Sequence, residues 1–253
     1  MRQIKLKSII FVCTIFIVLF MFVICDAKTN KPDVAEVLYQ RGDYIGSLEI
    51  YLDSYKKHPQ NESLIYNIGN AYFKLGHIGK AICFYRKSAK LAPENKDIKA
   101  NLKKARSEIV DQTINAKGSL IKKFVSIIDS FSFNIFLMAM ITLVSIFNIS
   151  TLVYFFWKKS ELTKNIFFVT VVLFFIYLLP FGFKTQREFF IESGVIISKK
   201  VEVKSGPSQT LSTLFFIHEG TEFQILQTTR QWIKIKLENG FVGWINEDNF
   251  WKI

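Results

Sequence analysis

Three long stretches without a charged residue constrain this chain more than any other feature. They cover residues 8–25, 130–157 and 165–183 of the 253-residue sequence. As α-helix, the second would be roughly 42 Å long and the third roughly 28 Å, against a hydrocarbon core of about 30 Å. A wholly soluble protein is therefore not expected, and we predict two transmembrane helices, at 132–157 and 165–183.

Residues 1–27 have the layout of a secretory signal peptide. Basic residues precede the first apolar stretch, and Cys25 and Ala27 put small side chains at the two positions that an export peptidase inspects. A rival interpretation makes Cys25 a lipidated cysteine, although the bulky Ile24 before it argues against acylation. The sequence leaves open whether the signal is cleaved, lipidated or retained as an anchor.

The segment between the two predicted spans, residues 158–164, is short and carries three lysines. The positive-inside rule places this loop in the cytoplasm. An exported amino terminus followed by two crossings also leaves residues 28–130 and 184–253 on one outer side. We therefore expect a protein of the bacterial inner (cytoplasmic) membrane, with both large regions on the periplasmic or extracytoplasmic side.

A juxtamembrane amphipathic segment is predicted at 114–131. Its apolar residues fall on one helical stripe with lysines beside it: Leu120, Ile121, Phe124, Val125, Ile128 and Phe131. The pattern fits a helix lying in the membrane interface. It fits equally well an extension of the first spanning helix.

Residues 28–113 repeat with an offset of 34, which aligns Gly42 with Gly76 and Pro59 with Pro93. A period of this length is typical of solenoids built from paired helices. Each glycine suits the turn within a helical hairpin, and each proline suits the end of its second helix. We predict two hairpins and a polar capping helix that begins near residue 96.

The segment YNIGNAYFKLGHIGKAICFYRKSAKLAP resembles the tetratricopeptide repeat nearly throughout. The resemblance implies a groove, lined by the first helix of each pair, that binds extended peptides or partner helices. On that helix, one stripe holds the candidate partner-binding residues Tyr66, Asn70, Phe73 and Lys74. The alternative is that Asn70 is structural and that Tyr66 and Phe73 pack between the repeats.

Residues 190–253 alternate apolar and polar side chains in short runs separated by turn signals such as Glu219-Gly220 and Asn239-Gly240. About five strands in so short a region predict a small all-β barrel. The segments VEVKSGPSQ, HEGTEFQIL and QWIKIKLENGFVGWINEDNF resemble the bacterial SH3-type domain. That resemblance implies binding of cell-wall peptides or other extracytoplasmic ligands.

Four aromatic residues of this region are candidates for a ligand surface: Trp232, Trp244, Phe250 and Trp251. Alternatively, the first two pack within the barrel, and Phe250 and Trp251 close its carboxy-terminal end.

The formal net charge of +12 is spread along the chain, and no region has a focused basic face. Nucleic-acid binding, which needs a dense basic patch and a reading element, is therefore not expected. Many of the lysines flank the predicted spans, where they suit contact with anionic membrane lipid.

No arrangement of residues predicts catalysis. Each of His58, His77 and His218 has a local explanation in a turn, and Cys83 has no sequence cue for thiolate activation. Phosphate-binding glycine loops and metal-ligand spacings are missing from the sequence. We expect no enzyme activity, no cofactor and no metal.

The fold class is thus multi-domain: a tetratricopeptide-like helical solenoid, a two-helix transmembrane hairpin and a small SH3-like barrel. This order resembles the Bacteroides aerotolerance (Bat) group, which implies membrane partners with von Willebrand A domains and a MoxR-type ATPase. We favour a scaffold or adaptor that binds protein partners. The alternatives are a receptor that binds or senses the cell wall and, more weakly, an accessory subunit of an envelope enzyme.

Overall fold

The computed structural model describes residues 34–111, 120–156 and 160–253. The predicted signal peptide, with Cys25, lies outside the described residues, as do the start of the juxtamembrane segment and the first part of the loop between the spans. Residues Ala35–Ile253 form one compact unit.

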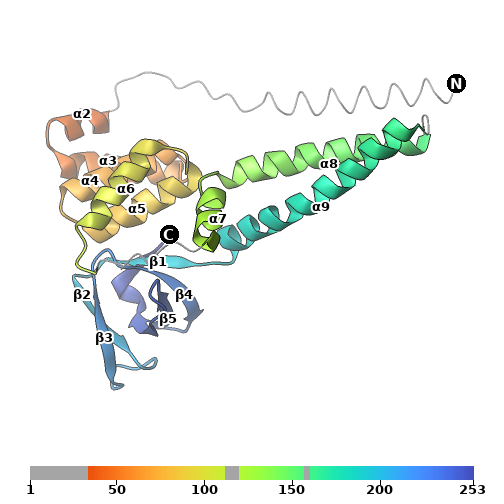
Figure 1. Ribbon diagram of the computed structural model, residues 1–253. Coiled ribbons are helices and arrows are strands. Elements are labelled where there is room, and N and C mark those ends of the chain that lie inside the picture. The colour runs from red at the N-terminus through yellow and green to blue at the C-terminus, as the bar shows by residue number, and fades with distance from the viewer. Residues whose placement is uncertain (1–33, 112–119, 157–159) are drawn as a thin grey trace. The chain divides into compact units, whose positions relative to one another are not determined.

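The amino-terminal region consists of helices joined by short turns (Figure 1). Along the chain they are α2 (Val34–Gln40), α3 (Tyr44–Lys57), α4 (Glu62–Lys74), α5 (Ile78–Leu91) and α6 (Lys96–Ser107). From α3 onward, each helix packs on the next one in the chain. The predicted succession of short helices is therefore present.

Local signals in the sequence explain where these helices begin. Asn61 Oδ1 accepts a hydrogen bond from the Leu64 N–H at 3.0 Å, and Asn95 Oδ1 accepts one from the Asp97 N–H at 2.9 Å. Such N-caps satisfy backbone donors that the helix leaves unpaired. The turn before α5 contains Gly76 at φ +77°, a left-handed conformation that glycine adopts without strain.

The core of the helical region is close-packed and rich in aromatic residues. Tyr51, Ile68 and Tyr85 are at most 1% exposed. Gly69 lies directly against the Tyr85 ring, whose nearest atom would be 2.7 Å from a β-carbon at that position. This glycine lets α4 and α5 approach closely, a role that small residues play in paired-helix folds.

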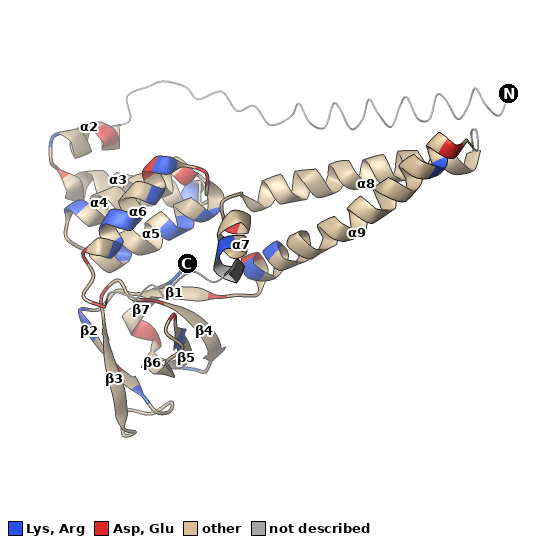
Figure 2. Ribbon diagram, viewed as in Figure 1, with Lys and Arg blue, Asp and Glu red and all other residues tan. Residues whose placement is uncertain are grey.

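Three further helices follow: α7 (Leu120–Asp129), α8 (Phe133–Phe156) and α9 (Glu161–Phe189). Both α8 and α9 are long and apolar enough to cross a membrane, and only 6% of the most apolar stretch of each is buried within the protein. Their charged residues are confined to the two ends of α9 (Figure 2). They pack on each other, with the Ser150 and Thr170 hydroxyls 2.8 Å apart in a buried hydrogen bond.

The structure differs from the sequence prediction at two helix boundaries. The second apolar helix extends beyond the predicted 165–183 at both ends. It begins at Glu161 because Ser160 and Thr163 form a capping box within the predicted loop, and it continues to Phe189. The backbone breaks at residues 130–132, so α7 is a separate helix. The interpretation of this segment as an extension of the first spanning helix is therefore wrong.

The carboxy-terminal region is one antiparallel sheet of seven strands. They are β1 (Ser193–Ile196), β2 (Lys200–Lys204), β3 (Thr213–His218), β4 (Glu222–Thr228), β5 (Trp232–Leu237), β6 (Val242–Asn246) and β7 (Phe250–Lys252). The spatial order is β3-β2-β6-β5-β4-β1-β7. A short 3-10 helix, η1 (Glu247–Asn249), precedes β7.

The expected closed barrel is wrong. Strand β3 pairs with β2 and strand β7 pairs with β1, and no ladder joins these two edge strands within the described sheet. All seven strands nevertheless contribute to one apolar core, whose most buried members are Ile196, Val203, Ile233, Ile235 and Ile245. The sheet thus encloses a core without closing its hydrogen-bond network.

Candidate functional site

Two of the four candidate partner-binding residues on α4 hold helices together. Asn70 Oδ1 accepts hydrogen bonds from the Tyr85 hydroxyl at 2.8 Å and from Asn101 Nδ2 at 3.0 Å. Asn101 Nδ2 also donates to the Tyr66 hydroxyl at 2.7 Å. These contacts join α4 to α5 and α6, so Tyr66 and Asn70 serve packing between helices.

The other two candidates differ from each other in exposure. Phe73 is half-buried against the helical core, and the Lys104 ammonium lies 5.3 Å from the centre of its ring. Lys74 is exposed, with its ammonium 5.9 Å from the Tyr44 ring. Of the four residues, Lys74 presents the most accessible side chain to a partner.

The neighbouring aromatic residues of β7 enter different cores. Phe250 is 9% exposed and packs edge-on against Phe223 in the sheet core. Trp251 packs instead against the helical core, with its ring centre 6.0 Å from that of Tyr72 and 6.1 Å from that of Phe84. Successive side chains of a strand point to opposite faces, so these two side chains pack into different cores.

The two tryptophans inside the sheet are also packed. Trp232 begins β5 and is 9% exposed, and Trp244 on β6 is half-buried opposite Lys204 of β2 and Lys234 of β5. The four aromatic candidates therefore do not form one continuous exposed surface.

The helical region and the sheet share one apolar cluster, which sequence reasoning missed. Val195 of β1 is fully buried in the helical core, and Trp251 and Ile253 pack against it. The sequence held one signal of this contact: residues 81–85 of α5 are five consecutive apolar residues, and all five are buried. A helix that is apolar on all sides needs neighbours on more than one face.

The turn between β3 and β4 caps helix α5. The Gly79 N–H donates a hydrogen bond to Glu219 Oε1 at 2.8 Å, whereas His77, the N-cap residue, makes no side-chain cap bond. A carboxylate at a helix amino terminus satisfies a free N–H and interacts favourably with the helix dipole. Thus a residue 140 positions away supplies the cap that the local sequence lacks.

Glycine is required on both sides of this contact. A β-carbon at Gly79 would overlap the backbone carbonyl oxygen of Ile196. Gly220 has φ +87°, and a β-carbon there would overlap the side chain of Ile109. Any other residue at position 79 would collide with the backbone of β1, and any other residue at position 220 would collide with Ile109.

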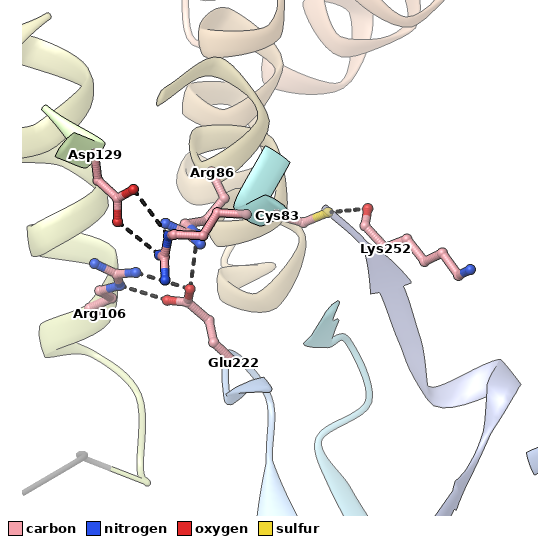
Figure 3. A network of polar contacts seen from close by, with 7 residues as sticks. Cys83, Arg86, Arg106, Asp129, Glu222 and Lys252 are labelled. Carbon is pink, nitrogen blue, oxygen red and sulfur yellow. Dashed lines mark hydrogen bonds and ion pairs between the residues drawn. The ribbon is translucent and has the colours of Figure 1, made fainter. Parts of the chain in front are cut away.

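Glu222, at the start of β4, binds two arginines of the helical region (Figure 3). Arg106 donates from Nε and Nη2 to the two carboxylate oxygens, at 2.6 and 2.9 Å. Arg86 Nε is 3.1 Å from Glu222 Oε2, but its N–H is not directed at an acceptor, so this contact is an ion pair without a hydrogen bond. The bidentate Arg106 contact fixes orientation as well as distance.

Asp111 makes the reciprocal contact from the helical side. Its carboxylate accepts hydrogen bonds from the His218 N–H at 2.6 Å and the Thr221 hydroxyl at 2.8 Å, and lies 2.9 Å from His218 Nδ1. Burial acts to raise the pKa of Asp111, but the hydrogen bonds from His218 and Thr221 together outweigh it and lower the pKa below its usual value. The ionised carboxylate therefore stabilises the junction.

Cys83 lies at the same junction and is fully buried. Its Sγ is 3.5 Å from the carbonyl oxygen of Lys252 (Figure 3). Burial raises the pKa of this thiol to about 11. The thiol is thus neutral at physiological pH, which does not suit a nucleophile.

Ion pairs also connect the junction to the long helices. Arg187 of α9 donates to both carboxylate oxygens of Asp129 on α7, at 3.2 and 2.8 Å, and Lys90 of α5 lies 3.5 Å from Glu188. The first pair joins the end of α9 to α7, and the second joins it to α5. In the part of the chain that the structure describes, no three His, Cys, Asp or Glu side chains gather to hold a metal ion.

Replacing Gly79 with alanine should open the junction while leaving α5 helical. Alanine favours helix over glycine by about 1 kcal/mol, but its methyl group would overlap the backbone of the sheet. Spin labels are placed at Lys56→Cys and Lys236→Cys, with native cysteines replaced by alanine. We expect the mean distance between the two labels to increase and the distribution of distances to broaden. Gly182→Ala, where a β-carbon meets nothing within 4 Å, is the control. An unchanged distance in Gly79→Ala would contradict the packing described.

The junction should also weaken in acid. Because the pKa of Asp111 is lowered in the folded protein, its stabilising contribution is complete above the unfolded pKa of about 3.9 and is lost as the pH falls through the folded value. The same label pair should report opening below about pH 4. Asp111→Asn should weaken the junction at neutral pH and make its opening less dependent on pH. Asp97→Asn, on the exposed side of α6, should behave as the parent does.

Comparison with known families identifies one part of the chain. Residues 198–252 match the bacterial SH3 domain. A comparison with curated proteins finds no match. Strands β2 to β7 therefore lie in a bacterial SH3 domain, a match that suggests binding of proteins or the cell wall.

Proposed function

We propose that this chain is a membrane-anchored extracytoplasmic scaffold or adaptor, held in a bacterial cytoplasmic membrane by α8 and α9. The apolar side chains of these helices support the anchor, because they would otherwise face water; Phe168, Phe175 and Leu179 are each more than 60% exposed. Isolated exposed apolar residues are common, but a continuous apolar surface along two helices requires a covering.

The observation that carries the proposal is the shared core of the helical region and the SH3 domain. The chain between them passes through α8 and α9, and two crossings return it to the compartment that it left. Packing of Val195 and Trp251 into the helical core requires both regions in one compartment. The predicted export signal makes that compartment the outer one.

The helical region, read as two tetratricopeptide repeats with a capping helix, is proposed to bind protein partners. Lys74, Lys103 and Lys104 are exposed cations of α4 and α6, and the Lys104 ammonium lies 5.3 Å from the ring centre of the half-buried Phe73. The order of segments resembles that of BatE in the Bat group, which suggests membrane proteins with von Willebrand A domains as partners within an envelope stress-tolerance complex.

A cell-wall receptor is the second candidate, and the match to the bacterial SH3 domain favours it. In that function the SH3 domain recognises the ligand, and the helical region, fixed to it by Glu219 and Glu222, transmits binding toward the membrane.

The proposed topology predicts a labelling pattern. Single cysteines at Lys56 and Lys236 should react with a membrane-impermeant maleimide in intact cells or spheroplasts, with native cysteines replaced by alanine. A cysteine at Lys164, between the two apolar helices, should react only after permeabilisation. Opposite accessibility of positions 56 and 236 would contradict the proposal.

Partner binding is best tested in the full chain, because removing the SH3 domain would expose the apolar face of α5. A photo-crosslinking amino acid at Lys74 should capture membrane protein partners. The same amino acid at Lys56, exposed on α3, is the matched control. Protein crosslinks from the SH3 domain but none specific to position 74 would favour the cell-wall receptor over the scaffold.

A further inference from the structure

A cleft of about 630 Å³ lies where α5 meets the end of the SH3 domain. It is lined by Lys87, Glu247, Asp248, Phe250, Trp251 and Lys252. Lys87 belongs to α5, and the other five residues belong to η1 and β7. The cleft is open to solvent, and α5 completes it by contributing Lys87.

The charges in this cleft are of both signs and remain apart. Two ammonium groups and two carboxylates line it, yet among these described residues no cation forms an ion pair with an anion of the cleft. Lys252 is paired outside the cleft with Glu192, at 3.0 Å, whereas Lys87 makes no ion pair with any described carboxylate. Among the described residues, the charges of Lys87, Glu247 and Asp248 are therefore left for a ligand to meet.

The carboxylates are held on a fixed backbone. The Glu247 N–H donates to the Gln231 carbonyl oxygen at 3.0 Å, and Asn246 Oδ1 accepts from the Asp248 N–H at 3.0 Å. The Ile197 N–H donates to the Asn249 carbonyl oxygen at 2.9 Å, which ties the other end of η1 to the sheet. The backbone that carries the two carboxylates therefore needs little reorganisation when a cation binds.

The cationic side is supported in a similar way. The Lys87 ammonium lies 5.4 Å from the centre of the Phe84 ring, and Phe84 in turn packs against Trp251. This contact holds the lysine stem along an apolar surface and leaves its ammonium group at the cleft. Trp251 adds an aromatic wall for apolar parts of a ligand.

From this arrangement we infer that the cleft binds short zwitterionic peptides. Lys87 receives the free carboxylate, Glu247 and Asp248 receive the free ammonium group, and Trp251 contacts the apolar part between them. This site deepens the proposed binding function by naming a ligand class. It requires the packing of α5 on the SH3 domain but not the membrane partners of the helical region.

Calorimetric titration of the full chain in lipid nanodiscs tests the inference. The probes are di-, tri- and tetra-alanine, whose ends are separated by about 3.5 Å per residue when extended. One length should bind best, and N-acetylation or C-amidation of that peptide should each weaken binding about tenfold, because each removes a charge-assisted contact.

Variants assign each end of the peptide. Lys87→Gln should remove the effect of amidation and keep that of acetylation, and the double variant Glu247→Gln, Asp248→Asn should do the reverse. Lys99→Gln, exposed on α6 outside the cleft, is the control and should bind as the parent does.

Three results would overturn the inference: no free peptide binds, blocked peptides bind as well as free ones, or the cleft variants keep both preferences. Binding of glycerophosphoethanolamine without binding of any peptide would also overturn it, since the site would then recognise a lipid headgroup. Peptide binding is measured without partner proteins. A negative photo-crosslinking result would therefore not affect this test, and a negative peptide result would not affect the proposed scaffold function.

Discussion

The contact between the β3–β4 turn and the amino terminus of α5 is the interaction on which the packing of the helical region against the SH3 domain depends. It requires glycine at positions 79 and 220, and it places Glu219 on a helix end that has no cap of its own. Once this approach is made, the second apolar face of α5 has a covering. Without it, Cys83 and Phe84 would face water.

The ion pairs and the aromatic contacts at this junction have different roles. Arg86, Arg106 and Glu222 keep between 24% and 43% of their side-chain surface exposed, and pairs of this kind contribute about 1 kcal/mol or less. Burial of a large apolar side chain such as Trp251 or Phe84 contributes about 1.5–3 kcal/mol. The aromatic packing therefore supplies most of the stability, while the bidentate Arg106–Glu222 contact selects one orientation of the sheet on the helices.

Features encoded locally were predictable, and features that depend on distant residues were not. The hairpin glycines lie within a few residues of the turns that they determine, and the apolar stretch of α8 needs no partner to be recognised. The open sheet could not be foreseen, because closure depends on how β3 and β7, far apart in the sequence, are placed. For the candidate site, Phe250 and Trp251 were expected on one surface, whereas alternation along β7 sends them to different cores. Nothing near Gly79 indicates that Glu219 lies beside it.

Helix α9 continues almost directly into the SH3 domain. Its charge-free stretch, residues 165–183, corresponds to about 28 Å, close to the hydrocarbon thickness of a bilayer, and only residues 190–192 separate the helix from β1. Where the bilayer is thinner than the apolar stretch of a helix, the helix adapts by tilting. In the proposed membrane setting, so short a connection couples the tilt of α9 to the orientation of the SH3 domain. A change in bilayer thickness that alters this tilt would reorient the SH3 domain above the membrane surface. The lipid composition around the anchor would then influence which direction the peptide cleft faces.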